Sequence, residues 1–253
     1  MKIKKIQKKQ NGKYEITLDD NLKIKTYDEI ILNNDILFSK ELNDEEIMKI
    51  DSENYYYDIY NKIVKMISNK LKSEHEIKDY LDKCDLTIKD KNKMLDTLKQ
   101  KGLINDVTFT KAYIHDKISF SNYGPLKIKS ELQKYGINDV IISECMEQVD
   151  RSIFDEKIEK YVLKKVNINH KYSKNMLLQK LKSELYLLGF DNVNIDDYVK
   201  DNNDILEKEI KKEYQKIKLK YSKNDVINKL YRKFYQKGFS RENIMKCIEN
   251  LDI

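Results

Sequence analysis

Hydrophobic and polar residues alternate along the first 26 positions with the period of two that is typical of a β-strand. The alternation is clean in residues 14–18 and 22–26 and partial in residues 2–6. Residues 19–21 and the pair Asn11-Gly12 have the composition of turns. The pattern predicts a small antiparallel ribbon with one apolar face. Because such a ribbon is only marginally stable alone, we expect it to pack on another element.

Further along the chain the apolar residues recur at steps of three and four, which predicts helices. Residues 27–33 and 44–50 have this pattern, and it continues from about residue 52 to the end. One landmark recurs: an apolar residue, a glycine four residues later, then a second apolar residue. It occurs at Leu132-Gly136-Ile137, Leu185-Gly189-Phe190 and Phe234-Gly238-Phe239, and at Leu81-Asp85-Leu86 with aspartate in place of glycine.

The landmarks are spaced 51, 53 and 49 residues apart. In addition, Tyr-Ser-Lys-Asn at residues 172–175 recurs unchanged at residues 221–224. A period near fifty predicts stacked supersecondary units. We therefore expect a mainly α fold: about four tandem three-helix repeats in an elongated curved array, after the small N-terminal antiparallel β ribbon. The predicted domains are 1–51 (ribbon and short helices), 52–105, 106–149, 150–202 and 203–253.

Capping residues and glycines mark the expected helix ends. Asp106 is predicted to cap the first helix of the second repeat, and serines at positions 73, 173 and 222 are predicted N-caps, with Glu76 completing a capping box. Gly124 precedes the second helix and Pro125 opens it, because proline lacks the N–H that a first helical turn leaves unpaired. Three glycines are predicted to end equivalent helices in the left-handed conformation, namely Gly136, Gly189 and Gly238.

The composition favours helices that each have one apolar stripe, and it does not favour a thick globular core. Hydrophobic residues make up 40% of the 253 positions and charged residues 36%, with a mean hydropathy of −0.74. No apolar run is long enough to span a bilayer, and no apolar segment follows the basic N-terminus as in a secretory signal. The expected location is the cytoplasm, without membrane association.

The sequence has no pattern that indicates catalysis or a cofactor. Cys84, Cys145 and Cys247 lack metal-ligand spacing, and two of them occupy the same repeat position, which predicts a core slot. The histidines, at positions 75, 115 and 170, are isolated. No glycine-rich phosphate loop is present. We expect no metal or cofactor, and a protein that is not an enzyme.

The formal net charge of +6 and the isoelectric point of about 8.8 suggest an acidic or polyanionic partner. The excess of lysine over arginine also fits AT-rich coding, so a solvated lysine surface is the alternative. The segment 205–221 has one apolar face and one basic face, which includes Lys208, Lys212 and Lys216. It predicts either contact with phosphates or a solvated helix with internal Glu–Lys pairs.

The second repeat resembles the central signature of the RecX family, regulators of the RecA recombinase. The resemblance rests on Gly-Leu-Ile-Asn-Asp at 102–106, then Phe109, Ala112 and Tyr113, then Tyr-Gly-Pro-Leu-Lys-Ile at 123–128, Glu131-Leu132 and Gly136-Ile137. Residues 73–81 look like the family's first repeat. The ribbon looks like the extension of longer members from Gram-positive bacteria. Asp85 departs from the glycine that the family usually has there.

The resemblance implies a non-enzymatic helical array that binds RecA and its single-stranded-DNA filament. Such proteins inhibit filament growth, strand exchange and the coprotease role of RecA, and so affect DNA repair, recombination and the SOS response. We expect a monomer whose concave basic face contacts RecA and DNA. The candidate contact residues are Lys111, Tyr113, Lys117, Tyr123, Lys127, Lys129 and Lys134, with the three lysines of segment 205–221. For both tyrosines, packing between helices is the alternative role.

Two other functions fit the helical repeats. A general DNA- or RNA-binding module would bind bare nucleic acid with a steep salt dependence. A protein-only adaptor would bind little DNA, and its lysines would be compositional. Only the signature at residues 102–137 favours regulation of RecA over these two.

Overall fold

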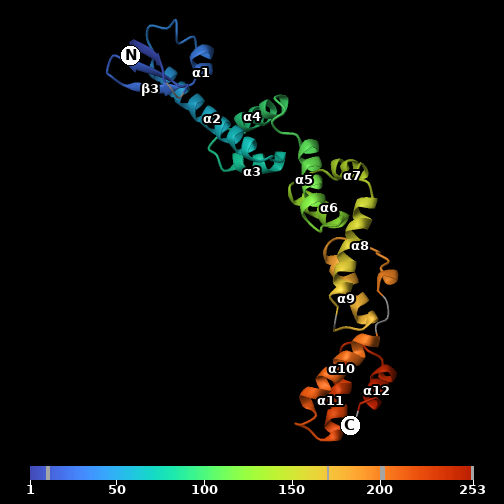
Figure 1. The fold of residues 1–253 in the computed structure, drawn as a ribbon. Helices are drawn as coiled ribbons and strands as arrows, with labels where there is room; N and C mark the ends of the chain where they lie inside the picture. The colour runs from blue at the N-terminus through green and yellow to red at the C-terminus, as the bar shows by residue number, and fades with distance from the viewer. Residues whose placement is uncertain (10–11, 170, 200–202, 252–253) are drawn as a thin grey trace. The chain divides into compact units, whose positions relative to one another are not determined.

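The computed structural model describes residues 1–9, 12–169, 171–199 and 203–251. Strands β1 (Ile3–Lys8), β2 (Tyr14–Leu18) and β3 (Lys23–Thr26) form an antiparallel sheet in that order (Figure 1). Ile16 pairs with Ile6 on one side and with Ile24 on the other. The predicted ribbon is therefore confirmed, although β1 begins one residue later and ends two residues later than expected. Asn11, predicted in the first turn, lies outside the described residues.

The sheet packs against two helices, α1 (Asp28–Asn33) and the start of α2 (Asp44–Asn69). Ile16 and Leu18 are fully buried with Ile30 and Ile50 in one apolar cluster. Polar contacts add to it: the Tyr27 hydroxyl and the Lys13 ammonium both donate to the Asp58 carboxylate on α2, the latter over 2.9 Å. The apolar face of the ribbon thus finds the partner that its marginal stability requires.

Helix α2 is longer than the pattern predicted. It runs without a break for 26 residues, so the helix expected at 44–50 and the helical pattern after residue 52 belong to one element. Asn43 starts it through a capping box with Glu46. Because no glycine or proline follows until after Asn69, nothing in the backbone stops it. The boundary predicted between residues 51 and 52 lies inside α2.

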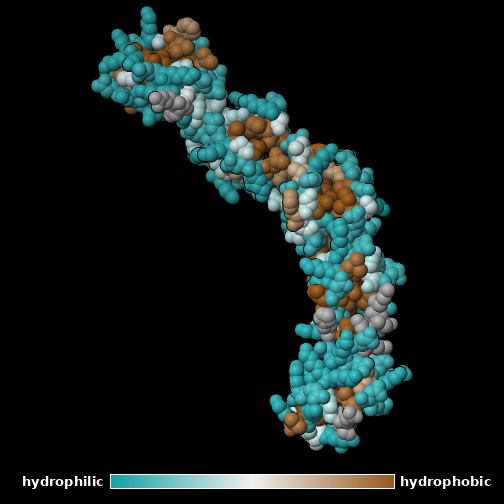
Figure 2. Space-filling model, viewed as in Figure 1, coloured by the Kyte–Doolittle hydropathy of each residue, from teal (hydrophilic) through white to brown (hydrophobic). Residues whose placement is uncertain are grey.

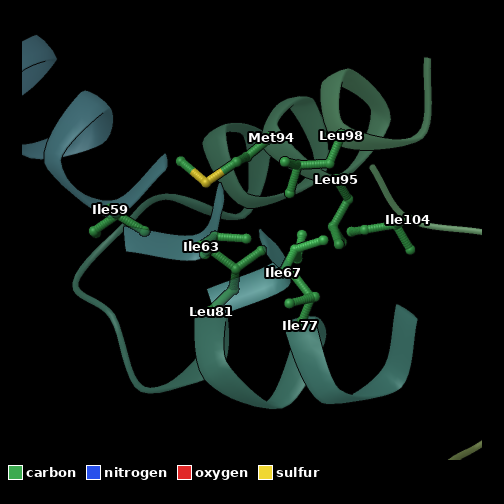
Figure 3. Packing of buried hydrophobic residues seen from close by; sticks show 9 residues of the cluster. All are labelled: Ile59, Ile63, Ile67, Ile77, Leu81, Met94, Leu95, Leu98 and Ile104. Carbon is green, nitrogen blue, oxygen red and sulfur yellow. The ribbon is translucent and has the colours of Figure 1, made fainter. Parts of the chain in front are cut away.

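The second half of α2 packs with α3 (Glu74–Asp82) and α4 (Ile88–Gln100). In Figure 3 the side chains from the three helices point toward one another. The cluster consists of Ile59, Ile63, Ile67, Ile77, Leu81, Met94, Leu95, Leu98 and Ile104. Met94 stands at the repeat position that Cys145 and Cys247 occupy, the predicted core slot, and it is 0% exposed. The next residue, Leu95, is 6% exposed.

Helices α5 (Asp106–Phe120), α6 (Pro125–Lys134) and α7 (Asp139–Glu147) follow, then α8 (Ser152–Asn167) and α9 (Lys174–Leu187). After the 3-10 turn η1 (Asp196–Tyr198) come α10 (Asn203–Ile217), α11 (Lys223–Tyr235) and α12 (Arg241–Glu249). The mainly helical fold with a small N-terminal sheet is confirmed. The backbone divides into two compact units, residues 1–109 with 135–137, and residues 110–134 with 138–253.

Two elements of the second unit differ from the predicted pattern. Within the described residues, the segment expected to form the third helix of the third repeat contains only the turn η1. It follows a polar run in which Asn192 has a φ of +51°, a conformation outside the helical region. Ile195 and Val199 are nevertheless buried there, so apolar side chains still enter the core of this repeat without a helix. The helix expected over 205–221 ends at Ile217, and Tyr221 instead precedes the N-cap of α11.

Asp106 does not cap α5 as predicted. The Asn105 side chain accepts the hydrogen bond from the Thr108 N–H over 2.9 Å, which makes Asn105 the capping residue. The carboxylate of Asp106 accepts instead from the Glu74 N–H, over 2.9 Å, at the start of α3. A carboxylate at that helix N-terminus is favoured by the helix dipole. Asp106 therefore stabilises a helix 32 residues away in sequence.

Candidate nucleic-acid interface

Four of the candidate residues come together in the second repeat. Tyr113 and Lys117 lie one turn apart on α5, whereas Tyr123 lies just before α6 and Lys127 in its first turn. The Lys117 ammonium is 5.0 Å from the ring centre of Tyr113 and 5.4 Å from that of Tyr123. The Lys127 ammonium is 4.3 Å from the Tyr123 ring centre. All four side chains are partly exposed, so this aromatic and cationic cluster is open to a ligand.

The turn that carries Tyr123 is held by a partly buried lysine that sequence reasoning missed. Lys157 of α8 donates to the carbonyl of Ser121 over 2.6 Å and to that of Lys117 over 3.3 Å. Burial lowers the pKa of Lys157. Its ammonium lies at the C-terminus of α5, where the helix dipole favours a cation. Lys157 is thus a positioning residue, and no local pattern distinguishes it from the other lysines of α8.

The other three candidates of this repeat differ from the cluster. Lys134 is ion-paired with Glu131 over 2.7 Å, and that hydrogen bond raises the pKa of Lys134. The Lys129 ammonium lies 3.8 Å from the Asp139 carboxylate. Lys111 is exposed on α5. Contacts therefore bring together only Tyr113, Lys117, Tyr123 and Lys127.

Two of the three candidate lysines of α10 lie close to glutamates of the same helix. Lys212 lies 3.8 Å from Glu209, and Lys216 lies 3.8 Å from Glu213. Lys208 is exposed. Exposed pairs of this kind contribute little to stability and are screened by salt. The geometry of α10 favours the alternative of a solvated helix with internal ion pairs.

The pairing of Tyr123 with a lysine recurs in the next two repeats at intervals of 49 residues. Tyr172 precedes the N-cap Ser173 of α9, and the Lys180 ammonium lies 4.4 Å from its ring centre. Tyr221 precedes the N-cap Ser222 of α11, and the Lys229 ammonium lies 4.2 Å from its ring centre. The sequence contained the signal, because both tyrosines open the duplicated Tyr-Ser-Lys-Asn segment. Its spacing marked the repeat but did not identify the lysine partners.

In the third repeat the pair lies in a pocket of about 370 Å³. Lys165 and Lys171 also line it, together with one acid, Glu184. Burial opposes ionisation of Glu184, but hydrogen bonds from Lys165 and Tyr161 outweigh it and hold the pKa of that carboxyl below its usual range. Three lysines around one carboxylate leave an excess of positive charge. Such a pocket suits a phosphate group.

A recurring joint between repeats fixes the position of these tyrosines. The Gly124 N–H donates to the Leu188 carbonyl over 2.6 Å, and the Ser173 N–H donates to the Lys237 carbonyl over 3.1 Å. In the first unit the Ser73 hydroxyl donates to the Tyr135 carbonyl over 2.8 Å. Each acceptor comes just before a glycine of positive φ, at 136, 189 or 238. Tyr123 and Tyr172 directly precede the donor residues Gly124 and Ser173, so these hydrogen bonds fix the positions of both tyrosines.

Gly124 has a role beyond starting a helix. A Cβ atom there would lie 2.5 Å from the Gly189 carbonyl oxygen, so only glycine permits this close approach of two repeats. Pro125 is the first residue of α6.

Neither a metal nor a membrane site is evident in the part of the chain that the structure describes. Its histidines, cysteines and acids do not gather in threes as a metal site would require. None of its helices is long and apolar enough to cross a membrane. His170 lies outside the described residues.

The second repeat matches a family model described as "RecX, second three-helix domain" over residues 105–146, which include the aromatic and cationic cluster. The regulatory protein RecX of Listeria innocua is 29% identical over 222 residues, covering 84% of this chain and 82% of the relative. That of Streptococcus gordonii is 27% identical over 225 residues, covering 85% and 86%. A crystal structure of regulatory protein RecX has a TM-score of 0.66 at 22% identity, covers 75% of this chain and 94% of its own, and shows a shared fold.

Proposed function

We propose that this chain is a RecX-type regulatory protein, which its similarity to the RecX domain model and to the RecX relatives supports. As such a protein it binds the RecA recombinase and its single-stranded-DNA filament and inhibits their activities. In this role it acts as a cytoplasmic monomer, without catalysis of its own, on DNA repair, recombination and the SOS response. The observation that carries the DNA contact is the tyrosine–lysine pair that recurs every 49 residues at 123, 172 and 221.

A tyrosine beside a lysine suits single-stranded nucleic acid for two physical reasons. The ring offers a face on which an unpaired base stacks, worth about 1–3 kcal/mol per base and tolerant of sequence. The ammonium offers a charge for the neighbouring phosphate, and its binding releases a counterion. A base that stacks on Tyr172 takes the place of the Lys180 ammonium, which then turns to the phosphate. Double-stranded DNA has no free base for this contact.

Repetition makes weak contacts effective. Three pairs on one chain bind one strand with an effective concentration that raises the overall affinity beyond that of any single pair. A regulator that covers several nucleotides at once opposes growth or rearrangement of a filament on the same strand. The proposal therefore expects inhibition at fewer copies of this protein than of RecA.

The test is ATP hydrolysis by the cognate RecA on single-stranded DNA, with this protein added well below one copy per RecA. We compare wild type with Lys127→Glu/Lys180→Glu/Lys229→Glu. The matched control, Lys134→Glu/Lys212→Glu/Lys216→Glu, changes the net charge equally at lysines that pair with their own helix. We expect inhibition by wild type and control, and a loss of about tenfold or more for the triple variant at the tyrosines.

Each outcome distinguishes between functions. If the triple variant with retained circular dichroism inhibits like wild type, the tyrosine–lysine pairs are not the interface. If wild type does not affect RecA but binds bare DNA tightly, the protein is the general nucleic-acid module. Little DNA binding and no effect on RecA would leave the protein-only adaptor.

A further inference from the structure

The second compact unit contains a pocket unlike the basic surfaces described above. It has a volume of about 660 Å³ and is lined by the start of α6, α7, α8 and the segment after α9. Its apolar lining includes Leu126, Met146, Phe154 and Ile158. Leu126 is 50% exposed, although it stands one residue from Lys127. Figure 2 shows hydrophobic patches of this kind set among a mostly hydrophilic surface.

The charge around this pocket is opposite to that of the chain. Glu147, Asp155 and Asp191 line it with a single basic residue, Arg151, whereas the whole chain carries a formal net charge of +6. Asp191 accepts a hydrogen bond from Asn192. Among the described residues, neither Glu147 nor Asp155 lies within ion-pair distance of a lysine or arginine. Because no such cation neutralises them, these two carboxylates are available to an external cation.

These properties select the class of ligand. An acidic rim repels the phosphates of a nucleic acid, so this pocket does not extend the tyrosine–lysine surface. Its volume lies within the range of about 300–1,000 Å³ that is usual for ligand pockets, and its apolar lining favours a hydrophobic side chain. The two free carboxylates favour lysine or arginine on either side of that side chain.

We propose that this pocket receives a segment of a partner protein that presents an apolar side chain between basic residues. The inference rests on the proposed function only for the identity of that partner, which would be the protein component of the filament. The pocket assigns α6 two roles at adjacent positions, because Lys127 belongs to the nucleic-acid surface and Leu126 to the protein surface. One repeat thereby contacts both components of a protein–DNA filament.

The joint between the second and third repeats forms the pocket. The Leu126 N–H donates to the Gly189 carbonyl over 3.1 Å, which fixes the exposed leucine beside Phe190. Phe154 and Phe190 are 7% and 6% exposed, and their rings meet edge to face with centres 6.4 Å apart. The floor is therefore packed before any ligand binds, which lowers the entropic cost of binding.

The first test uses the full chain without RecA. The protein is labelled with ¹³C on its methionine methyl groups, and the Met146 signal is assigned with the variant Met146→Leu. Two leucine-containing peptides are titrated, one flanked by lysines and the other by glutamates. We expect a saturable shift of the Met146 signal with the lysine-flanked peptide alone. No shift, or equal shifts with both peptides, would overturn the proposal.

The second test uses the cognate RecA filament on single-stranded DNA and, separately, bare single-stranded DNA. Glu147→Lys/Asp155→Lys is compared with Glu242→Lys/Glu249→Lys, which adds the same charge on α12. We expect the rim variant to bind the filament about tenfold more weakly, with bare-DNA binding unchanged or tighter, and the control to lose nothing. Equal filament binding by both variants would overturn the assignment to this partner. If the wild-type protein does not bind the filament, the proposed function is contradicted but the pocket proposal is not. The methionine spectra then show independently whether the pocket binds the lysine-flanked peptide.

Discussion

At the scale of single residues, the glycine at the end of each middle helix has two requirements to meet. Gly189 has a φ of +87°, which side chains rarely adopt, and a Cβ atom there would lie 2.5 Å from the Lys127 Cβ of the preceding repeat. Gly102 also has a positive φ, of +66°, but no atom lies within 4 Å of its would-be Cβ. Glycine is therefore required at position 102 by the backbone conformation alone, and at position 189 by both the backbone conformation and the lack of space for a side chain.

This difference predicts unequal costs of substitution. Gly102→Ala should lower stability by about 1 kcal/mol, the price of a left-handed alanine. Gly189→Ala should cost about 3 kcal/mol or more, since the backbone of α6 must also shift. Amide hydrogen exchange measures the local opening free energy in α4 for the first and in α6 and α9 for the second. If both substitutions lowered the local stability by a similar amount, the contact between Gly189 and α6 would not be sterically tight.

At the scale of elements, ion pairs between neighbouring helices supplement the apolar clusters. In the C-terminal repeat, Leu206 and Ile210 of α10 are buried with Leu230 and Phe234 of α11. Beside them the Lys233 ammonium of α11 donates to the Glu213 carboxylate of α10 over 2.6 Å. This hydrogen bond outweighs burial and holds the pKa of Glu213 below its usual value of 4.5.

The lowered pKa gives a pH dependence with a definite sign. Ionised Glu213 stabilises the folded repeat above pH 4.5, the ordinary value, and this contribution is lost as the pH falls through the lower folded-state pKa. Glu213→Gln should therefore be less stable than wild type at pH 7, and the difference should shrink below pH 4.5. Urea unfolding followed by circular dichroism measures it, with Glu249→Gln as the control. A difference that is independent of pH would exclude the ion pair as its cause.

At the scale of the whole molecule, three tyrosine–lysine pairs on one chain should act additively on one strand. For single-stranded DNA, the logarithm of affinity falls with the logarithm of salt concentration by about 0.7 for each phosphate contact. Replacing Lys127, Lys180 or Lys229 by glutamine should reduce the slope by about 0.7 each, and the triple replacement by about 2. Fluorescence anisotropy over a salt series measures the slope, with Lys134→Gln as the control. A slope that falls equally in the control would indicate net charge alone.

Much of the fold was predictable because its causes are local. Alternation with period two identified β2 at its observed bounds, and the spacing of glycines located the ends of α6, α9 and α11. The N-caps Ser73, Ser173 and Ser222 were also identified from sequence. Strand pleat, helix period and the steric cost of positive φ act over a few residues, so the sequence displays them directly.

The candidate site was predictable only in part. The family resemblance and the charge pattern singled out the four residues that the structure brings together, Tyr113, Lys117, Tyr123 and Lys127, but also Lys129, Lys134 and lysines of α10 that pair with nearby acids. Lysines look alike in sequence, whereas their availability depends on whether an acid lies within a few ångströms. Lys180 and Lys229 were missed because their tyrosine partners lie eight residues away.

The sequence by itself determined most of the elements and their repeat, since these follow from periodicity and backbone sterics. Only the tertiary structure decided which distant groups meet. It placed the Asp106 carboxylate on α3, the Lys157 ammonium on the end of α5, and Leu126 in an acidic-rimmed pocket between repeats. Each of these depends on separations in space between segments tens of residues apart, and such separations are fixed by packing and not by any local pattern.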